Sequence, residues 1–243
     1  MPPPMIVTLV KPWPFPLAAG MNALPDPDPA RHPQLDWREG GVPVSTRFDD
    51  PYFSLEGGLA ETRHVFLEGN GLPARLRPGF HVAELGFGTG LNCLALAQVA
   101  AVPVMMTSFE AWPMSLPQLE QAHAAFPELA DLSARLRAGW GRDVIQVGQV
   151  RLHLVVGDVA QTLPGWRGRA DAWFLDGFSP ARNPEMWRDE IMAHVGRCTA
   201  PGGTFATYTA AGGVRRALAQ AGFTVVRRPG FGRKRHMSAG VKP

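Results

Sequence analysis

The chain has 243 residues, of which 45% are hydrophobic and 19% charged, which fits one large α/β domain and excludes a fibrous or repetitive protein. Two cysteines, Cys93 and Cys198, are too few for a disulfide framework or a zinc site, so we expect reduced thiols, a cytoplasmic location and no metal. The net charge is only +3, yet residues 191–243 hold nine Lys or Arg and no Asp or Glu. This asymmetry suits a polyanionic partner such as nucleic acid, and it equally suits a solvated basic face.

The first 33 residues form a proline-rich head. No basic region precedes its apolar part, and Pro12, Pro14 and Pro16 interrupt any continuous helix. The head therefore lacks the features of a signal peptide or a membrane span, and we expect no membrane association. The predicted organisation is a flexible head over residues 1–33 and a single domain over residues 34–243.

Strands and helices alternate along the rest of the chain. Strands are predicted over residues 44–48, 64–67, 80–85, 103–110, 151–158, 170–176, 203–208, 223–227 and 235–241, and helices over 91–99, 116–126, 127–140, 185–198 and 213–221. This order predicts a Rossmann-like α/β fold with a seven-stranded, mostly parallel sheet. The close final pair predicts a hairpin with an antiparallel edge strand, and residues 43–67 a small N-terminal hairpin over the ligand pocket.

A glycine-rich turn follows the first core strand. Glycines at positions 86, 88 and 90 allow a tight turn and a close approach of the backbone to a ligand. The dinucleotide fingerprint would need Gly or Ala where Leu91 stands. The pattern, with Glu84 before it, instead resembles the first motif of S-adenosylmethionine-dependent methyltransferases. A glycine-rich turn that binds no cofactor remains the alternative.

Three later strands end on acids. Glu110 can accept hydrogen bonds from both ribose hydroxyls of an adenosyl cofactor, and Asp158 can accept from the adenine amino group while Val159 packs on the ring. Asp176 ends an apolar strand, so its desolvated carboxylate can orient a nucleophilic amine or accept its proton. Glu110 could instead cap a helix or lie in solvent, and Asp176 could cap the element that follows it. The ends of parallel strands meet at one edge of the sheet, so we expect these acids in one crevice.

Two loop aromatics and the lack of a nucleophile motif bear on how a substrate base would bind and react. Tyr52 and Phe178 lie in loops expected to border the crevice, where they could stack on a base or pack structurally. The chain has no Pro-Cys nucleophile motif of the kind that attacks a pyrimidine ring. Covalent methylation of a ring carbon is therefore disfavoured.

Taken together, the sequence resembles the methyltransferase domain of the bifunctional tRNA-modifying MnmC family, a domain that also occurs as a stand-alone enzyme. The resemblance covers about residues 37–240 and is carried by residues 43–54, 58–62, 65–70, 84–92, 173–187, 203–209, 214–216 and 230–235. It implies methyl transfer from S-adenosylmethionine to the exocyclic amine of 5-aminomethyl-2-thiouridine at the tRNA wobble position. The product would be 5-methylaminomethyl-2-thiouridine.

The resemblance maps the cofactor loop onto residues 86–90 and three functional acids onto Glu110, Asp158 and Asp176, and the basic C-terminal third and the loop after Asp176 indicate the tRNA contacts. The cofactor-binding residues would be Glu84, Gly86, Phe87, Gly88, Thr89, Gly90, Asn92, Glu110, Asp158, Val159 and Asp176, with Asp176 as the catalytic acid. The tRNA would contact Tyr52, Phe178, Ser179, Pro180, Arg182, Arg215, Arg216, Arg233, Lys234 and Arg235, with its anticodon loop nearest Arg182. We expect a monomer, and a separate FAD-dependent oxidase is a possible upstream partner.

Two alternatives stay open at this level. An aminopropyltransferase of the spermidine synthase kind also uses an adenosyl sulfonium and also has a glycine turn and strand-end acids. Its small polyamine substrates would not need a basic C-terminal third. A non-catalytic tRNA-binding module would be free to lose Glu110, Asp158 and Asp176, which are all present.

Overall fold

The computed structural model describes residues 32–243. The predicted flexible head lies outside the described residues, apart from its last two positions. Within the described part, no helix combines the length and apolar character needed to cross a bilayer.

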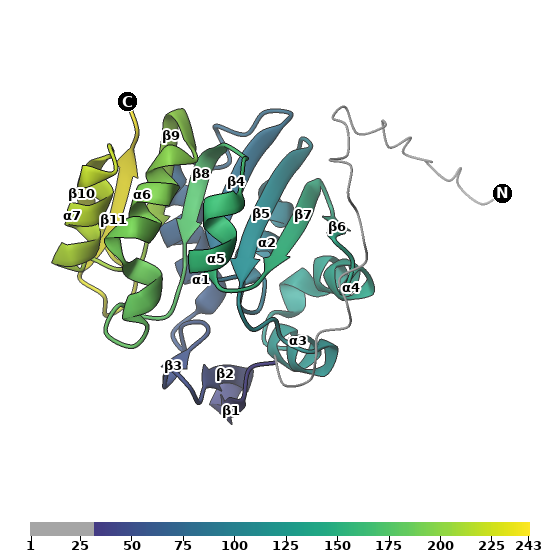
Figure 1. Cartoon of the computed structure of the whole chain (residues 1–243). Helices are drawn as coiled ribbons and strands as arrows, with labels where there is room; N and C mark the ends of the chain where they lie inside the picture. Colours follow the sequence, from purple (N-terminus) through teal and green to yellow (C-terminus); the bar gives the residue numbers. More distant parts are fainter. Residues whose placement is uncertain (1–31) are drawn as a thin grey trace.

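An eight-stranded sheet forms the centre of the molecule (Figure 1), with the strand order β10-β11-β9-β8-β4-β5-β7-β6. The strands are β4 (Phe80–Leu85), β5 (Val104–Glu110), β6 (Val144–Val147), β7 (Val150–Val156), β8 (Ala170–Leu175), β9 (Thr199–Thr207), β10 (Thr224–Pro229) and β11 (His236–Val241). Strands β9, β8, β4, β5 and β7 are parallel to their neighbours in this series. The predicted class, a mostly parallel Rossmann-like sheet, is confirmed.

Antiparallel pairs close both ends of the sheet. The C-terminal hairpin is present as predicted, and β11 lies between β9 and β10, antiparallel to both. At the other edge β6 pairs antiparallel with β7. The predicted count of seven strands was one short because β6 has only four residues. A tight turn at Gly148 (φ 57°) joins it directly to β7, so it leaves little pattern of its own.

Helices cover both faces of the sheet. In Figure 1, α5 (Val159–Thr162) and α6 (Asp189–Arg197) lie in front of it and α2 (Leu91–Val99) lies behind. The remaining helices are α1 (Gly58–Thr62), α3 (Leu116–His123), α4 (Ala130–Ala138) and α7 (Gly212–Gln220). Ser115 caps α3 through a capping box with Gln118.

Side chains of the central strands alternate between two hydrophobic clusters. On β8, Ala172 and Phe174 join the cluster that contains Leu94 of α2, whereas Trp173 and Leu175 join the cluster that contains Ile191 of α6. Because successive residues of a strand point to opposite faces, a strand buried on both faces reads as a continuous apolar run. This pattern is what made the strand recognisable from sequence.

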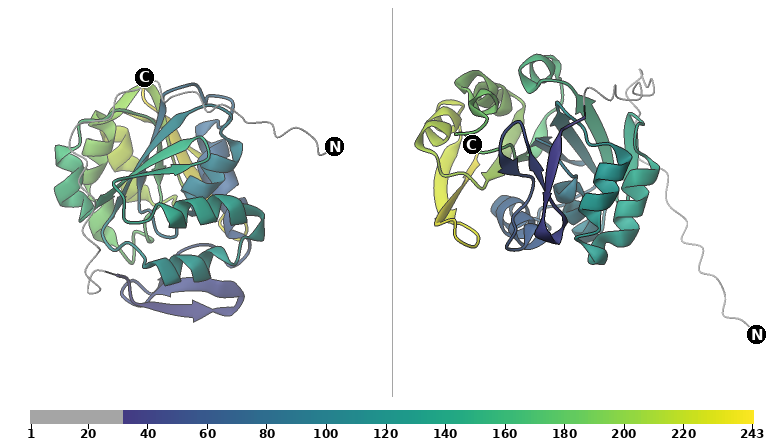
Figure 2. Two further views of the ribbon diagram at one scale, coloured as in Figure 1. Left: turned by 90° about the vertical axis from the view of Figure 1, so that its right-hand side faces the viewer. Right: turned by 90° about the horizontal axis from the view of Figure 1, so that it is seen from below.

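The N-terminal part differs from the prediction. A small sheet of β1 (Leu35–Arg38), β2 (Val42–Ser45) and β3 (Asp50–Pro51) starts earlier than the predicted strand at 44–48. The predicted strand at 64–67 was wrong, because Arg63–Leu67 form a π-helical turn that continues α1. Val65, Phe66 and Leu67 are buried, and so short an apolar run does not distinguish a strand from a buried helix. Figure 2 shows the small sheet (purple) below the carboxyl ends of the main strands.

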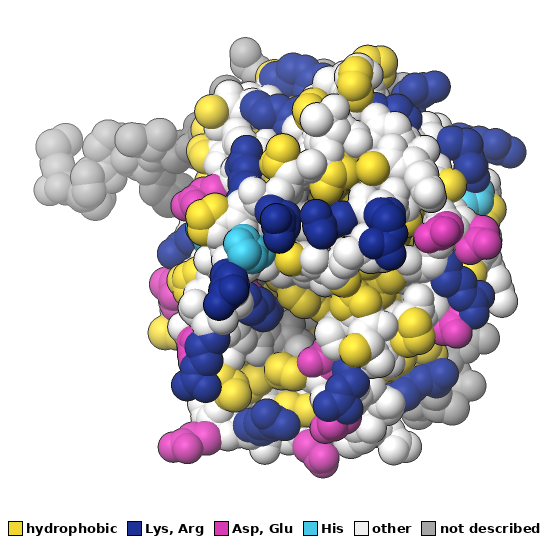
Figure 3. Space-filling model, turned by 90° about the vertical axis from the view of Figure 1, so that its left-hand side faces the viewer, with side chains coloured by type: hydrophobic (Ala, Val, Ile, Leu, Met, Phe, Trp, Pro, Cys, Tyr) yellow, Lys and Arg dark blue, Asp and Glu magenta, His cyan; other side chains and the backbone are white. Residues whose placement is uncertain are grey.

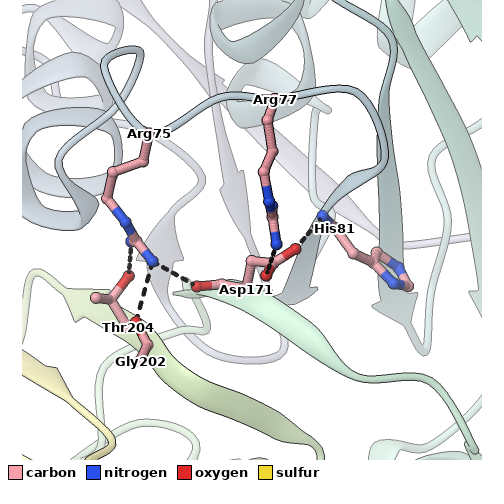
Figure 4. A network of polar contacts seen from close by, with 6 residues as sticks. All are labelled: Arg75, Arg77, His81, Asp171, Gly202 and Thr204. Atoms are coloured by element: carbon pink, nitrogen blue, oxygen red, sulfur yellow. Dashed lines mark hydrogen bonds and ion pairs between the residues drawn. The ribbon is translucent and has the colours of Figure 1, made fainter.

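A polar network fixes the amino ends of β4, β8 and β9 (Figure 4). Asp171, in β8, accepts from Arg77 at 2.8 Å and from the backbone N–H of His81 at 2.9 Å. The Arg75 guanidinium donates to Thr204 Oγ1 at 2.6 Å and to the Asp171 carbonyl at 3.2 Å. It also donates to the carbonyls of Asn70 and Gly202. The loop before β4 is thereby tied to two other strands.

Candidate functional site

A cavity of about 410 Å³ lies at the carboxyl ends of β4, β5 and β8, on the side of the small N-terminal sheet. It combines residues of the glycine turn, the strand-end acids, the 48–62 segment and the β10–β11 loop. Its lining includes Asp50, Tyr52, Glu61, Gly86, Phe87, Gly88, Thr89, Asn92, Glu110, Asp176, Phe178, Ser179, Tyr208 and Lys234. Figure 3 shows the α7 and β10 side of the molecule, where hydrophobic side chains (yellow) line a hollow and Lys and Arg side chains (dark blue) lie around it.

The glycine turn needs its glycines for two different reasons. A Cβ on Gly86 (φ 85°) would lie 2.1 Å from the carbonyl oxygen of Asp176, so only glycine lets the turn pack against the end of β8. Gly88 (φ 54°) faces the ring of Tyr52, 3.0 Å from where its Cβ would lie. The turn and the Asp176 loop are thus in backbone contact, as the shared-crevice prediction required.

Glu110 is fixed by the backbone around it. One carboxylate oxygen accepts from the N–H of Gly88 at 2.9 Å and the other from the N–H of Trp112 at 2.9 Å. Burial raises the pKa of Glu110, and these backbone hydrogen bonds work in the opposite direction. Glu110 also lines the cavity, so its carboxylate can meet a ligand hydroxyl there. This geometry suits the predicted role as acceptor for the two ribose hydroxyls.

Asp176 lies at the end of β8, opposite Glu110 across the glycine turn. Its Oδ2 accepts from Nδ2 of Asn92 at 2.7 Å. Burial raises the pKa of Asp176 to about 7; the Asn92 hydrogen bond and the Lys234 ammonium oppose this, and Glu61 adds to it. The carboxyl group therefore changes charge near neutral pH, the property expected of a group that handles protons.

Glu84 is behind the cavity wall rather than in it. Its side chain is fully buried, accepting from Ser108 Oγ at 2.5 Å and from Asn92 Nδ2 at 2.9 Å. Burial raises the pKa of Glu84 well above its usual value. Glu84 does not line the cavity, because the strand points this side chain inward, and its contact with a cofactor stays a prediction. Glu84 instead accepts a hydrogen bond from the Asn92 amide, and the same amide group donates to Asp176.

Three further predicted cofactor residues do not line the cavity. Asp158 caps α5 by accepting from the N–H of Ala160 at 2.8 Å, and Val159 is buried against the core. Gly90 (φ 75°) begins α2, where a Cβ would clash with the Phe87 ring. Helix capping is therefore the contact that the structure shows for Asp158. Contact of Asp158 and Val159 with an adenine stays a prediction.

An aromatic wall separates the cavity from the small N-terminal sheet. Phe178 stacks on Phe48 at a centroid distance of 4.8 Å and meets Tyr52 edge-on at 4.9 Å. The backbone N–H of Ser179 donates to Asp50 Oδ2 at 2.7 Å, which fastens the loop after β8 to the 48–56 segment. Both aromatic residues predicted to border the crevice do line it.

Sequence reasoning missed Glu61 and Tyr208 as lining residues, and it assigned Lys234 to a phosphate contact rather than to the cavity wall. Glu61 (α1), Tyr208 (directly after β9) and Lys234 (the β10–β11 loop) meet in the cavity wall. Lys234 Nζ lies 2.7 Å from Glu61 Oε1 and 4.2 Å from the centroid of the Tyr208 ring. The Tyr208 hydroxyl donates to the Gly177 carbonyl at 2.7 Å. No local pattern signals contacts between residues so distant in sequence; only the membership of Lys234 in a basic stretch drew attention to it.

The other predicted tRNA-contacting residues lie outside the cavity. Arg182 pairs with Asp49 at 2.7 Å, and Arg233 pairs with Glu56 at 2.7 Å while its side chain is 92% exposed. Arg216 and Arg235 are exposed, and Arg215 and Pro180 are half-buried. Exposed ion pairs contribute little to stability, so these arginines are available to a polyanion.

The chain was compared with known proteins. The profile of a family described as S-adenosyl-L-methionine-dependent methyltransferase matches residues 120–243. A relative from Chromobacterium violaceum, a tRNA 5-methylaminomethyl-2-thiouridine biosynthesis bifunctional protein MnmC, is 46% identical over 227 residues, which is 86% of this chain and 34% of the relative. The chain thus spans about a third of that relative's length. A crystal structure of MnmC2 from Aquifex aeolicus superposes with a TM-score of 0.69 at 21% identity, covering 87% of this chain and 71% of that one.

Proposed function

Since the chain belongs to this family of S-adenosyl-L-methionine-dependent methyltransferases, we propose that it methylates the exocyclic amine of 5-aminomethyl-2-thiouridine at the wobble position of tRNA. The product is 5-methylaminomethyl-2-thiouridine. The observation that carries the proposal is that one cavity contains the glycine turn, Glu110 and Asp176. The substrate follows the name of the 46% identical relative.

The cavity fits S-adenosylmethionine in size and in the groups it offers. Pockets for ligands of this size run from about 300 to 1,000 Å³, and the volume here is about 410 Å³. We propose that Glu110 accepts from the ribose hydroxyls and that Gly86 and Gly88 let the cofactor approach the backbone. Asn92 and Asp176 then border its methionine part. When bound, the cofactor supplies the electrophilic methyl group.

Asp176 serves the amine in this proposal. An aliphatic ammonium has a pKa of about 10, and only the neutral amine has a lone pair for attack. Proton transfer to a carboxylate whose pKa is about 7 is therefore uphill by roughly 3 units, or about 4 kcal/mol, before desolvation of the ammonium lowers that difference. Asn92 fixes the orientation of the carboxylate, so Asp176 can first hold the ammonium and then accept its proton.

The base must leave the anticodon stack to reach Asp176. Tyr52 and Phe178 border the cavity and offer aromatic faces or edges to an extruded base. Ser179, Pro180 and Arg182 follow on the same loop, where the anticodon loop would lie. Arg215, Arg216, Arg233 and Arg235 would contact phosphates.

The remaining parts of the proposal concern partners. We propose that a monomer binds tRNA in the cytoplasm, and that an oxidase supplies the aminomethyl group where the substrate is not delivered directly. The family match does not favour an aminopropyltransferase or a non-catalytic binding module.

A methyl-transfer assay with labelled S-adenosylmethionine tests the proposal. Label should enter tRNA that carries 5-aminomethyl-2-thiouridine and not tRNA with an unmodified wobble uridine. Calorimetry should show binding of S-adenosylmethionine in preference to its decarboxylated form, which an aminopropyltransferase would prefer. Equal labelling of both tRNAs would refute the assigned substrate.

A further inference from the structure

Three segments far apart in the sequence build a small cation site inside the cavity. The Glu61 carboxylate comes from α1, the Tyr208 ring from the end of β9, and between them lies the Lys234 ammonium from the β10–β11 loop. The ammonium is 2.7 Å from the carboxylate and 4.2 Å from the ring centroid. A carboxylate together with an aromatic face is a combination that binds alkylammonium groups.

The two protein walls of this site are the Glu61 carboxylate and the Tyr208 ring, and neither depends on Lys234 for its burial. The Glu61 side chain is only 11% exposed. The Tyr208 hydroxyl donates to the carbonyl of Gly177 at 2.7 Å, which orients the ring beside the residue that follows Asp176. Burial, together with the nearby carboxylates of Asp176, Asp50 and Glu61, raises the pKa of Tyr208, so its hydroxyl remains a neutral donor. The Tyr208 ring therefore keeps its place when the occupant leaves, and the buried Glu61 carboxylate is left in need of another cation.

The occupant, by contrast, is loosely held. The Lys234 side chain is 47% exposed and reaches the site from an exposed loop. A half-exposed ion pair contributes up to about 1 kcal/mol, and a cation–π contact of this kind adds about as much. Rotation about the lysine side-chain bonds removes the ammonium without moving the backbone.

Lys234 carries the same chemical group as the proposed substrate, a primary ammonium on an aliphatic carbon. It also lies close enough to Asp176 to influence its pKa. We propose that Glu61 and Tyr208 form a recognition site for the primary amine of the substrate, and that Lys234 fills this site until the substrate displaces it. The displaced lysine, at the cavity mouth, is then free to pair with an RNA phosphate. This inference rests on the proposed function, because it takes the substrate to carry a primary amine.

Binding of methylammonium tests the site without any methyl transfer. In the K234M variant the resident ammonium is gone, and NMR titration with ¹³C-labelled methylammonium should show binding about tenfold or more tighter than to the wild-type protein. The matched control is R227M, which removes an exposed cation on β10 outside the cavity and should bind methylammonium as the wild type does. Adding E61Q to K234M should abolish the gain. Equal binding to K234M and R227M, or a gain that survives E61Q, would overturn the proposal.

Kinetics on tRNA then separate recognition from a structural role. The E61Q variant should raise the KM for 5-aminomethyl tRNA about tenfold, with unchanged affinity for S-adenosylmethionine and only the small fall in unfolding temperature that loss of the Lys234 ion pair causes. A fall in unfolding temperature with an unchanged KM would show that Glu61 only supports the fold. If the wild-type protein methylates no such tRNA, the proposed function fails, while the methylammonium titration still decides whether the amine site exists.

Discussion

Asp171 lies near the amino end of β8 and Asp176 directly follows its carboxyl end, and the surroundings of these two aspartates differ. Asp171, at the amino end, accepts from Arg77 and from the backbone N–H of His81 and lies beside Arg75. Asp176, at the carboxyl end, accepts from Asn92, and the Lys234 ammonium near it is itself paired with Glu61. Burial raises the pKa of Asp176 to about 7.

The comparison shows what separates a structural acid from a functional one on the same strand. A carboxylate whose partners are cations and backbone donors stabilises the fold, and substituting it should cost stability. A carboxylate that is desolvated and only partly compensated is held ready for a ligand cation. The following predictions test whether this division holds, from the largest expected effect to the smallest.

The largest effect is expected for D176N. The amide cannot accept the proton of the amine, so kcat should fall by about 10²-fold or more, the range for a positioned acid–base group. Affinity for S-adenosylmethionine should remain near the wild-type value, and the unfolding temperature should not fall. Steady-state kinetics, calorimetry and thermal unfolding measure the three quantities.

The matched control is D171N, an identical change at the other end of β8. It should lose about 1–3 kcal/mol of unfolding free energy, because Arg77 and the His81 N–H lose a charged partner, and it should keep its kcat. If the two variants showed the reverse pattern, the division of roles along β8 would be wrong.

Glu110 comes next. E110A should weaken S-adenosylmethionine binding by about 1.5–3 kcal/mol, the scale for losing hydrogen bonds to a charged acceptor. Calorimetry measures the affinity. An alanine at this position also frees the N–H groups of Gly88 and Trp112, so E110Q, which keeps an acceptor for one of them, serves as the milder control. Wild-type affinity in both variants would remove the ribose contact from Glu110.

The pH dependence of kcat/KM and of stability should show a smaller effect. Asp176 must be ionised to serve the amine, so kcat/KM should fall about tenfold per pH unit below pH 7, following its raised pKa of about 7. The folded protein favours the protonated form of Asp176, because folding raises this pKa from 3.8 to about 7. The stability of the wild-type fold that depends on this proton is fully present at low pH and is lost as the pH rises through 7. The kcat/KM of D176N should therefore show no fall below pH 7. Its free energy of unfolding should gain on that of the wild type as the pH rises from about 4 to 7.

The smallest effects are expected on the basic surface. Reversing Arg233 and Arg235 to Glu should raise the KM for tRNA several-fold and should lower the salt slope by roughly 0.7–0.9 per lost phosphate contact. Arg135 and Arg142, exposed near the opposite β6 edge, provide a charge-matched control pair. An unchanged KM and salt slope would make the basic C-terminal third a solvated face.

Sequence patterns predicted the central strands and the shared crevice because these features are local. A strand buried on both faces, such as β8, is a continuous apolar run, and the acid after it must lie at the carboxyl edge of the sheet. The inward direction of Glu84 was missed because it depends on where the strand ends to within one residue. The Glu61–Lys234 pair was missed because it joins α1 to the β10–β11 loop, and such contacts leave no periodic pattern.

Nucleoside mass spectrometry tests the central claim most directly. Wild-type protein, S-adenosylmethionine and tRNA carrying 5-aminomethyl-2-thiouridine are incubated, and the digested nucleosides are analysed beside parallel reactions with D176N and D171N. The proposal predicts conversion to 5-methylaminomethyl-2-thiouridine by the wild type and D171N, with little or none by D176N. An unchanged 5-aminomethyl-2-thiouridine pool with wild-type protein that binds S-adenosylmethionine, or a methyl group on any other atom of the tRNA, would contradict it.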